Sequence, residues 1–151
     1  MATTSTVPAA IDALLTALNA ALPAGVDAYE SWPGHQAAAE MVVLGEVTWD
    51  DYEIASLKTG RQRRQENYRV GVEVFVIGQD GSTPADPSPA RDRAFSLLTD
   101  LEDLLADTPK LGLGTTVQVV QFHATEAGPR VFEKAWAYRV AGQIEVQARL
   151  Q

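Results

Sequence analysis

Glu66–Gly78, with the sequence ENYRVGVEVFVIG, is the stretch that decides the fold. Alternate side chains of an extended chain point to opposite faces, and on one face five of them in a row are aromatic or β-branched. A β-branched run at this spacing predicts a half-buried strand and disfavours a helix. The basic run KTGRQRRQ directly precedes this strand, at residues 58–65. The residues that share the apolar face are Tyr68, Val70, Val72, Val74 and Val76.

Composition and charge limit the class of protein. The chain has 151 residues, of which 46% are hydrophobic, so we expect one folded domain over residues 1–151. Its formal net charge of −8 disfavours a general nucleic-acid binder or a binder of anionic membranes, although a local basic patch is compatible with it. The chain contains no cysteine, which excludes disulfides and thiolate metal ligands.

Targeting signals are not evident in the sequence. The N-terminal residues MATTSTVPAA contain no basic region followed by an apolar run, so a secretory signal is not expected. No apolar run approaches the roughly 20 residues that a membrane-spanning helix requires. The sequence therefore predicts a soluble protein that is made and used without export.

Periodicity and turn residues place the other elements around the strand at 66–78. Leucines at helical spacing predict two amphipathic helices, each begun near a proline and ended by proline and glycine. The predicted order is a helix at residues 9–22, strands at 26–32 and 41–49, a long loop at 50–65, the strand at 66–78, a loop at 79–89, a helix at 89–106, a strand at 115–124, a turn at 126–130 and a strand at 131–150.

The last segment, residues 131–150, has the cleanest alternation in the chain. At about 3.3 Å per residue, a strand of this length exceeds the usual range. We expect it to bend at Gly142, or to project beyond the sheet and meet a neighbouring molecule. Either a bulge or burial on both faces is expected at Val119 and Val120, where alternation breaks. The order of elements predicts an α+β fold with a single mixed or antiparallel β-sheet and two helices packed on one face.

Candidate metal-binding residues are few. His123 and Glu126 lie close in sequence, but a strand that ends in a turn need not point them the same way, and most isolated histidines are structural. Asp50, Asp51 and Glu53 lack the glycine and the spacing of an EF-hand loop, so a solvated acidic turn is expected there.

Phosphate-binding and nucleophile motifs are also missing. Gly112 and Gly114 follow a helix and precede a strand, which is the reverse of a phosphate-binding loop. No GxSxG sequence occurs, and His35 lies in a segment unrelated to His123. We therefore predict no catalytic residue, no cofactor and no metal site.

Two charged surfaces are the remaining candidates for function. The basic run is either a solvated loop or an arm that docks on an acidic protein surface or faces DNA, although it has no aromatic residue to stack on bases. The outer side of the second helix is acidic. Binding of the basic arm of one copy to the acidic helix of the next would join copies head to tail into a ring or a filament. The last strand would add to this contact by edge pairing, or would simply have a polar outer face. The candidate interface residues are Lys58, Arg61, Arg63, Arg64, Asp100, Asp103, Asp107, Arg139 and Arg149.

Four features in order extend over nearly all of the chain. An amphipathic helix at 9–22 is followed by LKTGRQRRQENYRVGV at 57–72, with a glycine, a basic pair, Glu-x-Tyr and an alternating strand. A leucine-rich helix then follows a proline-rich loop, and the last strand ends in IEVQARL at 144–150. Together they resemble the tail terminator, or tail-tube completion, proteins of long-tailed bacteriophages, which are related to minor tail proteins. The resemblance lies in order and pattern, and no single motif is diagnostic.

The resemblance implies an α+β protomer that forms a hexameric ring on the last ring of the tail tube. Such a ring stops tube polymerisation and presents a surface to the head connector, with no catalytic residues. Residues 58–64 would be an inter-subunit or tube-facing loop, and the acidic residues would line a lumen through which DNA passes without sequence-specific binding. The partners would be further copies of the chain, the major tail tube protein and the head–tail connector. The location would be the virion, after synthesis in the host cytoplasm.

Two alternatives stay open from the sequence. The first is a neighbouring neck role, as a head-completion or tail-to-head joining protein, since these proteins also form rings from small α+β protomers. The second is a cytosolic enzyme or small-ligand-binding domain. A ring-forming protein would show its assembly in its native mass, whereas a ligand-binding domain would stay monomeric and melt at a higher temperature with its ligand.

Overall fold

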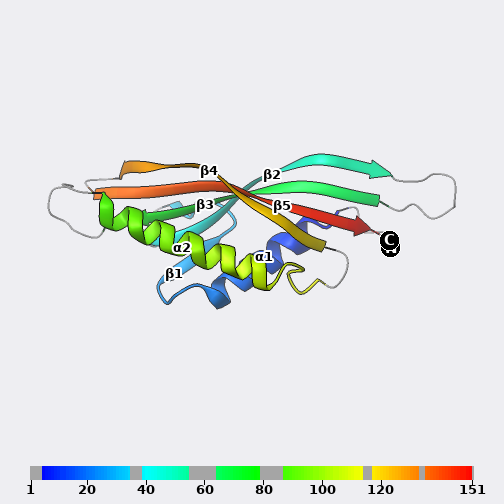
Figure 1. Cartoon of the computed structure of the whole chain (residues 1–151), viewed down its shortest axis with the longest axis horizontal. Coiled ribbons are helices and arrows are strands. Elements are labelled where there is room, and N and C mark those ends of the chain that lie inside the picture. Colours follow the sequence, from blue (N-terminus) through cyan, green and yellow to red (C-terminus); the bar gives the residue numbers. More distant parts are fainter. Residues whose placement is uncertain are drawn as a thin grey trace.

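The computed structural model describes residues 5–34, 39–54, 64–78, 87–113, 117–132 and 135–150. Its five strands form one sheet in the order β1-β2-β3-β5-β4 (Figure 1). β1 runs parallel to β2, and every other neighbouring pair is antiparallel. The elements are α1 (Val7–Ala21), β1 (Val26–Tyr29), β2 (Glu40–Ile54), β3 (Arg64–Ile77), α2 (Ser88–Asp107), β4 (Val117–Phe132) and β5 (Ala135–Leu150).

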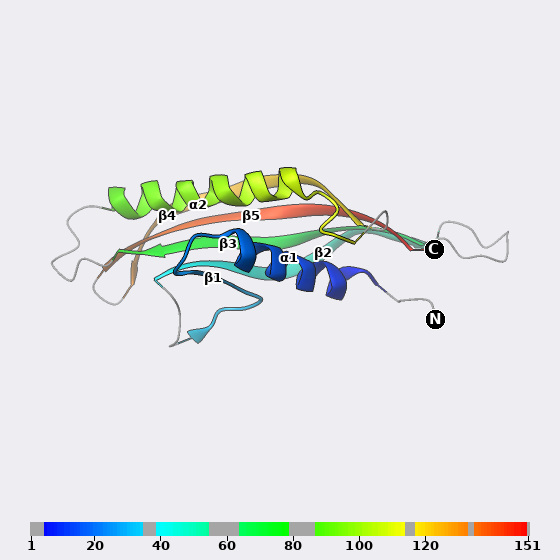
Figure 2. The ribbon, with the colours of Figure 1, turned by 90° about the horizontal axis from the view of Figure 1, so that it is seen from below.

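Both helices lie on the same face of this sheet, which confirms the predicted α+β fold. Figure 2 shows the two helices next to each other over the sheet, with α2 on the β4 and β5 side and α1 on the β1 and β2 side. Each helix turns one apolar stripe toward the sheet, because leucines and alanines recur every three or four residues. The buried residues are Ala10, Ile11, Leu14 and Leu18 of α1, and Ala90, Ala94, Leu97, Leu98, Leu101 and Leu105 of α2.

β3 lies in the middle of the sheet, as its sequence predicts. Tyr68, Val70, Val72, Val74 and Val76 all point to the helix side and are at most 4% exposed. β5 contributes Val140, Ile144, Val146 and Ala148 to the same core, because its register sets them opposite the core residues of β3. Burial of each such side chain contributes about 1.5 to 3 kcal/mol to folding, so this layer is the main source of stability.

Two predicted turns are instead parts of long strands. Residues 126–130 continue β4, since Glu126 to Arg130 pair with Ala141 to Ala137 of β5. The acidic residues 50, 51 and 53 lie in β2, which pairs with β3 as far as Ile54. A register shift interrupts the alternation in both strands, between Trp49 and Asp51 in β2 and between Ala124 and Glu126 in β4. The sequence there does not alternate strictly between apolar and polar residues, so alternation alone does not predict a strand. The bulge predicted at Val119 and Val120 is confirmed by a register shift between Val119 and Gln121.

The expectation that the last strand projects beyond the sheet is wrong. β5 pairs with β3 from Ala137 to Leu150 without a register shift, and this pairing continues through Gly142. β4 occupies its other side, so β5 has no free edge for pairing with a neighbour. Gly142 serves close packing instead. A Cβ atom there would lie 2.6 Å from Cζ of Phe122 and 2.5 Å from the carbonyl oxygen of His123.

We expect Gly142→Ala to lower the free energy of unfolding by about 1 to 3 kcal/mol, because the added methyl group overpacks the sheet against Phe122. The control is Gly45→Ala, where the nearest atom to an added Cβ is the Gly71 carbonyl oxygen at 3.7 Å, an ordinary contact. Urea denaturation of both variants measures the difference. Equal loss of stability in the two variants would contradict this role for Gly142.

A buried carboxylate fixes the start of α1 to β3. Glu66 is fully buried, and its Oε2 accepts hydrogen bonds from the Thr6 backbone N–H at 3.0 Å and the Thr6 hydroxyl at 2.9 Å. The Ser5 hydroxyl adds a third bond at 3.3 Å, and the Thr6 hydroxyl also lies 3.1 Å from the Tyr68 hydroxyl. A negative charge at a helix N-terminus is favourable, because the N–H groups there carry partial positive charge. Glu66 therefore replaces the side-chain cap that Thr6 does not provide to its own helix.

Tyr68 makes this cluster sensitive to high pH. Burial raises the pKa of the Tyr68 phenol above its ordinary value of 10.0, the hydrogen bond with Thr6 opposes this, and the Glu66 carboxylate adds to the rise. Above about pH 10 the unfolded chain loses this proton while the folded chain keeps it, so the unfolded state gains stability. Below that pH this group adds no pH dependence.

We therefore expect the free energy of unfolding to decline above about pH 10 more steeply in the native sequence than in Tyr68→Phe. The variant should be about 1 kcal/mol less stable at pH 7, because it loses the hydrogen bond to Thr6. Urea denaturation at a series of pH values gives both quantities. Parallel pH profiles for the two proteins would show that Tyr68 does not carry the effect.

Candidate interaction surfaces

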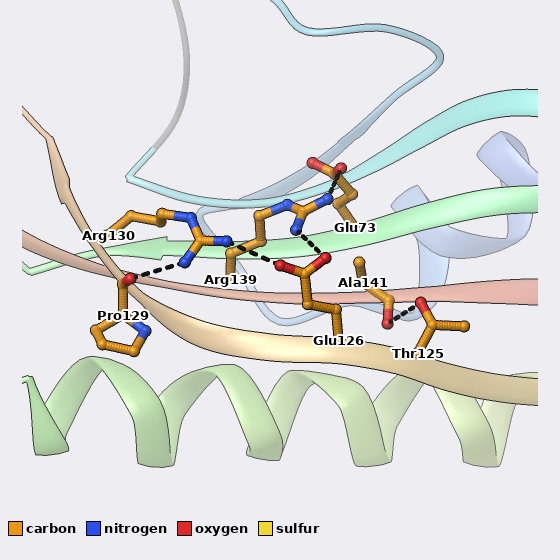
Figure 3. Close-up of polar contacts among 7 residues, drawn as sticks. All are labelled: Glu73, Thr125, Glu126, Pro129, Arg130, Arg139 and Ala141. Carbon is orange, nitrogen blue, oxygen red and sulfur yellow. Dashed lines mark hydrogen bonds and ion pairs between the residues drawn. The ribbon is translucent and has the colours of Figure 1, made fainter.

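The face of the sheet away from the helices is polar, and charged side chains from three neighbouring strands meet on it. Glu73 of β3 and Glu126 of β4 both lie level with Ala141 of β5. Because Ala141 is small, the longer Arg139 two residues earlier in β5 reaches both carboxylates. Figure 3 shows these side chains on the side of the sheet opposite α2.

Four of these residues form an alternating series, which we term the charge ladder: Glu73, Arg139, Glu126 and Arg130. Arg139 donates a hydrogen bond to Glu73 and lies 3.5 Å from Oε2 of Glu126. Arg130 then donates to Oε1 of Glu126 at 3.0 Å and, with its other terminal nitrogen, to the Pro129 carbonyl oxygen at 3.0 Å (Figure 3). The ladder contains two positive and two negative groups, so it projects little field beyond the surface.

Arg139 is the central member of the ladder. Its side chain is 24% exposed, against 58% for that of Glu126. The hydrogen bond to Glu73 raises the pKa of Arg139, burial opposes this, and the charges of Glu73 and Glu126 reinforce the rise. Arg139 therefore stays charged, and its charge is already neutralised within the chain.

A contact between His123 and Glu145 and an ion pair between Arg69 and Asp50 lie on the same face. Nε2 of His123 is 3.5 Å from Oε2 of Glu145, and Nε of Arg69 is 2.9 Å from Oδ2 of Asp50. His123 and Glu126 do share this face, but they bind different partners. Among the residues that the structure describes, no group of three or more His, Cys, Asp or Glu is arranged to hold a metal ion.

One end of the polar face is apolar. Met41, Val43, Phe75 and Ala137 form a small buried cluster there, separate from the main core. The Trp32 ring stands edge-on to that of Phe75, with 5.3 Å between the ring centroids. Trp32 itself is 44% exposed, so it covers the cluster and presents an aromatic surface beside the charge ladder.

The structure separates the predicted interface residues into different places. Lys58, Arg61 and Arg63 lie outside the described residues. Arg64 begins β3, where its backbone pairs with Ile54 and Leu150. The remaining five residues divide between the two faces of the sheet: Asp100, Asp103 and Asp107 lie on α2, while Arg139 and Arg149 lie on the polar face.

The acidic residues of α2 point away from the sheet, because they fall opposite its buried leucine stripe in the helical period. Asp103 and Asp107 are exposed and Asp100 is half-buried. They therefore cannot share a surface with Arg139 of the same chain, which lies behind the sheet. A different pair holds α2 to β2: Arg93 donates Nε and Nη2 to the two oxygens of Glu40, both at 3.0 Å.

A shallow open groove of about 640 Å³ runs along the outer side of α1. Small side chains line it, including Ala13 and Ala17, and the segment from Thr108 to Leu113 forms its other wall. The lining is mainly apolar and contains one carboxylate, that of Asp12. Within the described part of the chain, no helix is both long and apolar enough to span a membrane.

Sequence reasoning missed Glu66 and the partners of Arg139. Glu66 is in phase with Tyr68 and Val70 on the buried face, so its burial was detectable from the alternation. The pairing of Arg139 with Glu73 and Glu126 was not, because it depends on which strands are neighbours. The bidentate pair of Arg93 and Glu40 likewise joins segments that only the tertiary fold brings together.

The fold defines the chain as an α+β protein with a five-stranded mixed sheet. No protein-family model matches the sequence, and no curated protein matches it. Among solved structures, the chain is similar to a chain of a structure described as the virion of a native gene transfer agent particle. The match covers 98% of both chains, with 17% sequence identity and a TM-score of 0.44. A similarity at this level does not assign a function.

We expect Arg139→Gln to lower the free energy of unfolding by about 1 to 2 kcal/mol, because it leaves Glu73 and Glu126 without their shared charged partner. The control is Arg91→Gln, whose pair with Asp92 is between side chains that are 48% and 72% exposed; such a pair contributes at most about 0.5 kcal/mol. Denaturation in low and high salt measures both variants. A loss in Arg139→Gln no larger than that of the control would show that the ladder does not stabilise the sheet.

Proposed function

We propose that this chain is a structural protein of a phage-type virion, which caps the head-proximal end of the tail tube as a ring. The ring ends tube polymerisation and provides the joint to the head connector. The observation that carries the proposal is the order of elements along the chain. The helix, the basic segment, the strand Glu66–Gly78, the leucine-rich helix and the last strand resemble tail terminators in sequence, and the α+β fold implied by that family is the fold described above.

A ring needs a contact between unlike surfaces of neighbouring copies. We propose that the basic segment, Lys58 to Arg64, of one copy meets the acidic side of α2 in the next. Supporting this, Asp103 and Asp107 are exposed and point away from their own sheet. The strands on either side of the basic segment in sequence are β2 and β3, whereas α2 lies toward β5 and β4 (Figure 2).

The proposed partners are further copies of this chain in a hexamer, the major tail tube protein and the head–tail connector. DNA would pass through the ring without sequence-specific contacts. Only one face of the sheet can be turned to this passage, because the acids of α2 and the charge ladder lie on opposite faces. A surface of either kind gives phosphates few free cations: α2 is acidic on that side, and the arginines of the ladder are already paired.

A neck role remains the second candidate within the same class, and the same assembly measurements address it. For a small-ligand-binding domain, the groove beside α1 is the relevant feature. It is open and lined mainly by alanines and threonines, whereas ligand sites usually enclose most of the ligand and present a few convergent polar groups. We therefore favour the structural role.

The first test is assembly of tail tubes with and without this protein, observed by negative-stain microscopy beside its native mass. Tubes should stop at a defined length with an extra ring at one end. Tubes of unchanged length without end density would overturn the terminator role, and binding to the head connector alone would favour the neck role.

The second test concerns the basic segment. Arg61→Glu with Arg63→Glu should abolish capping, because it replaces attraction to α2 with repulsion. The matched control, Arg91→Glu with Lys110→Glu, changes the net charge equally at two other exposed positions and should still cap tubes. Adding Asp103→Lys and Asp107→Lys to the first variant should restore capping. Normal capping by the first variant would exclude the basic segment from the contact.

A further inference from the structure

Other parts of the chain already occupy a section of each edge of the sheet. The Asn19 side chain pairs with both backbone groups of Ala28, accepting from its N–H at 2.9 Å and donating to its carbonyl oxygen at 3.5 Å, which occupies the outer side of β1. At the start of β4, the Val119 N–H donates to the Pro109 carbonyl oxygen at 2.6 Å. These contacts limit where another strand can be added.

Two long edges are left without a strand partner among the described residues. β1 pairs with β2 only from Glu40 to Val43, so the outer side of β2 from Leu44 to Ile54 is open. β4 is the last strand on the opposite side, and its outer side is open from Val120 to Phe132. A long unpaired edge is a template for pairing with another chain unless it is protected.

The directions of these two edges match. Three antiparallel steps, from β2 to β3 to β5 to β4, separate them, so β4 runs opposite to β2. A rotation about an axis along the strands keeps every strand direction and keeps the helices on the same side. It therefore sets β4 of one copy antiparallel to β2 of the next, which continues the pattern of the sheet.

Exposed apolar side chains accompany both edges on the helix side of the sheet. Beside β4 lie Val131, which is 66% exposed, and Phe95 of α2, which is 43% exposed and packs on Tyr138 at 6.0 Å between ring centroids. Between Val131 and the middle of β4, the exposed residues on this side are small or rigid, Ala127 and Pro129. On β2 the corresponding residue is Trp49, which is 49% exposed.

Charge disfavours the symmetric alternative at β2. The open half of β2 contains Glu46, Asp50, Asp51 and Glu53 and no basic residue, so two such edges would repel each other. The open part of β4 contains one acid and one base, Glu126 and Arg130, which pair with each other, so it carries no net charge. An edge of β2 is therefore repelled less by the edge of β4 than by a second β2.

We propose that the outer edge of β4 in one copy binds the outer edge of β2, Leu44–Ile54, in a second copy. Trp49 then lies on the surface formed by Ala127, Pro129 and Val131, and Phe95 closes its side. The contact is heterologous, so repetition makes a closed ring when the rotation closes. This inference rests on the proposed ring and names the surfaces that build it.

The first experiment measures association of the full-length chain by native mass spectrometry and sedimentation over a range of concentrations. Trp49→Lys and Val131→Lys should each weaken association by about 30-fold or more, as expected when an interface anchor worth about 2 kcal/mol is lost. Both residues are exposed, so far-ultraviolet circular dichroism should be unchanged. The control is Ala20→Lys, an exposed residue of α1 that belongs to neither edge strand. Equal association of all variants would overturn the proposal.

The second experiment uses the natural absence of cysteine. Thr48→Cys places a thiol on the polar face of β2, and Arg130→Cys places one on the polar face of β4. With a short bismaleimide, a mixture of the two single variants should give cross-linked dimers, whereas each variant alone should give none. The double variant should give a ladder of products that ends at the size of the ring.

These outcomes separate the inference from the proposed function. Dimers from Arg130→Cys alone would show symmetric β4 pairing and would overturn the inference. A ring that caps tubes but forms no mixed cross-link would also overturn it, while the terminator function would stand. A chain that stays monomeric and leaves tubes uncapped would overturn both.

Discussion

The antiparallel ladder between β3 and β5 is the interaction on which the rest of the structure depends. It runs from the pair of Arg64 and Leu150 to the pair of Ile77 and Ala137 without a register shift. One side of this ladder carries the valines and the isoleucine that both helices cover, and the other side carries Glu73 and Arg139. A slip of one residue would exchange the two faces and bury charge. The same register therefore defines the core, the charge ladder and the positions of the outer strands.

Much of the fold was predictable from local pattern, because alternation in β3 and β5 and leucine spacing in the helices are strong signals. The two outer long strands were not. β2 and β4 contain register shifts. Residues 48–50 of β2 are exposed and residues 120–131 of β4 are exposed or half-buried, so hydrophobic burial imposes no strict period there. The acidic residues of β2, and Gly128 with Pro129 in β4, therefore predict turns. In the structure, pairing with β3 and β5 continues both strands through these residues. The interior glycine of β5 suggested a bend, whereas its function is to accept the Phe122 ring.

The surfaces were harder to predict than the fold. Alternation places Glu73 and Arg139 on the faces of their strands opposite the buried residues, but only strand order makes them partners. The choice of Arg139 as a free interface cation overlooked its neutralisation by Glu73 and Glu126. Asp103 and Asp107 are exposed, as helical spacing requires. They lie on the helix side of the sheet, whereas Arg139 lies on the opposite face. Edges available for pairing follow from topology as well: the final strand is enclosed on both sides, and the open edges belong to β2 and β4.

The Glu66 carboxylate also has a consequence for the order of folding during synthesis. Thr6 and Glu66 are 60 residues apart, and a helix of the length of α1 is only marginally stable alone in water. At about 5 to 20 residues per second, the ribosome adds the cap of α1 on the order of several seconds after the helix itself. α1 thus cannot complete its own N-terminus when it is made, and its apolar stripe stays without a sheet until β3 exists. α1 precedes all five strands in sequence and is among the last elements to be secured.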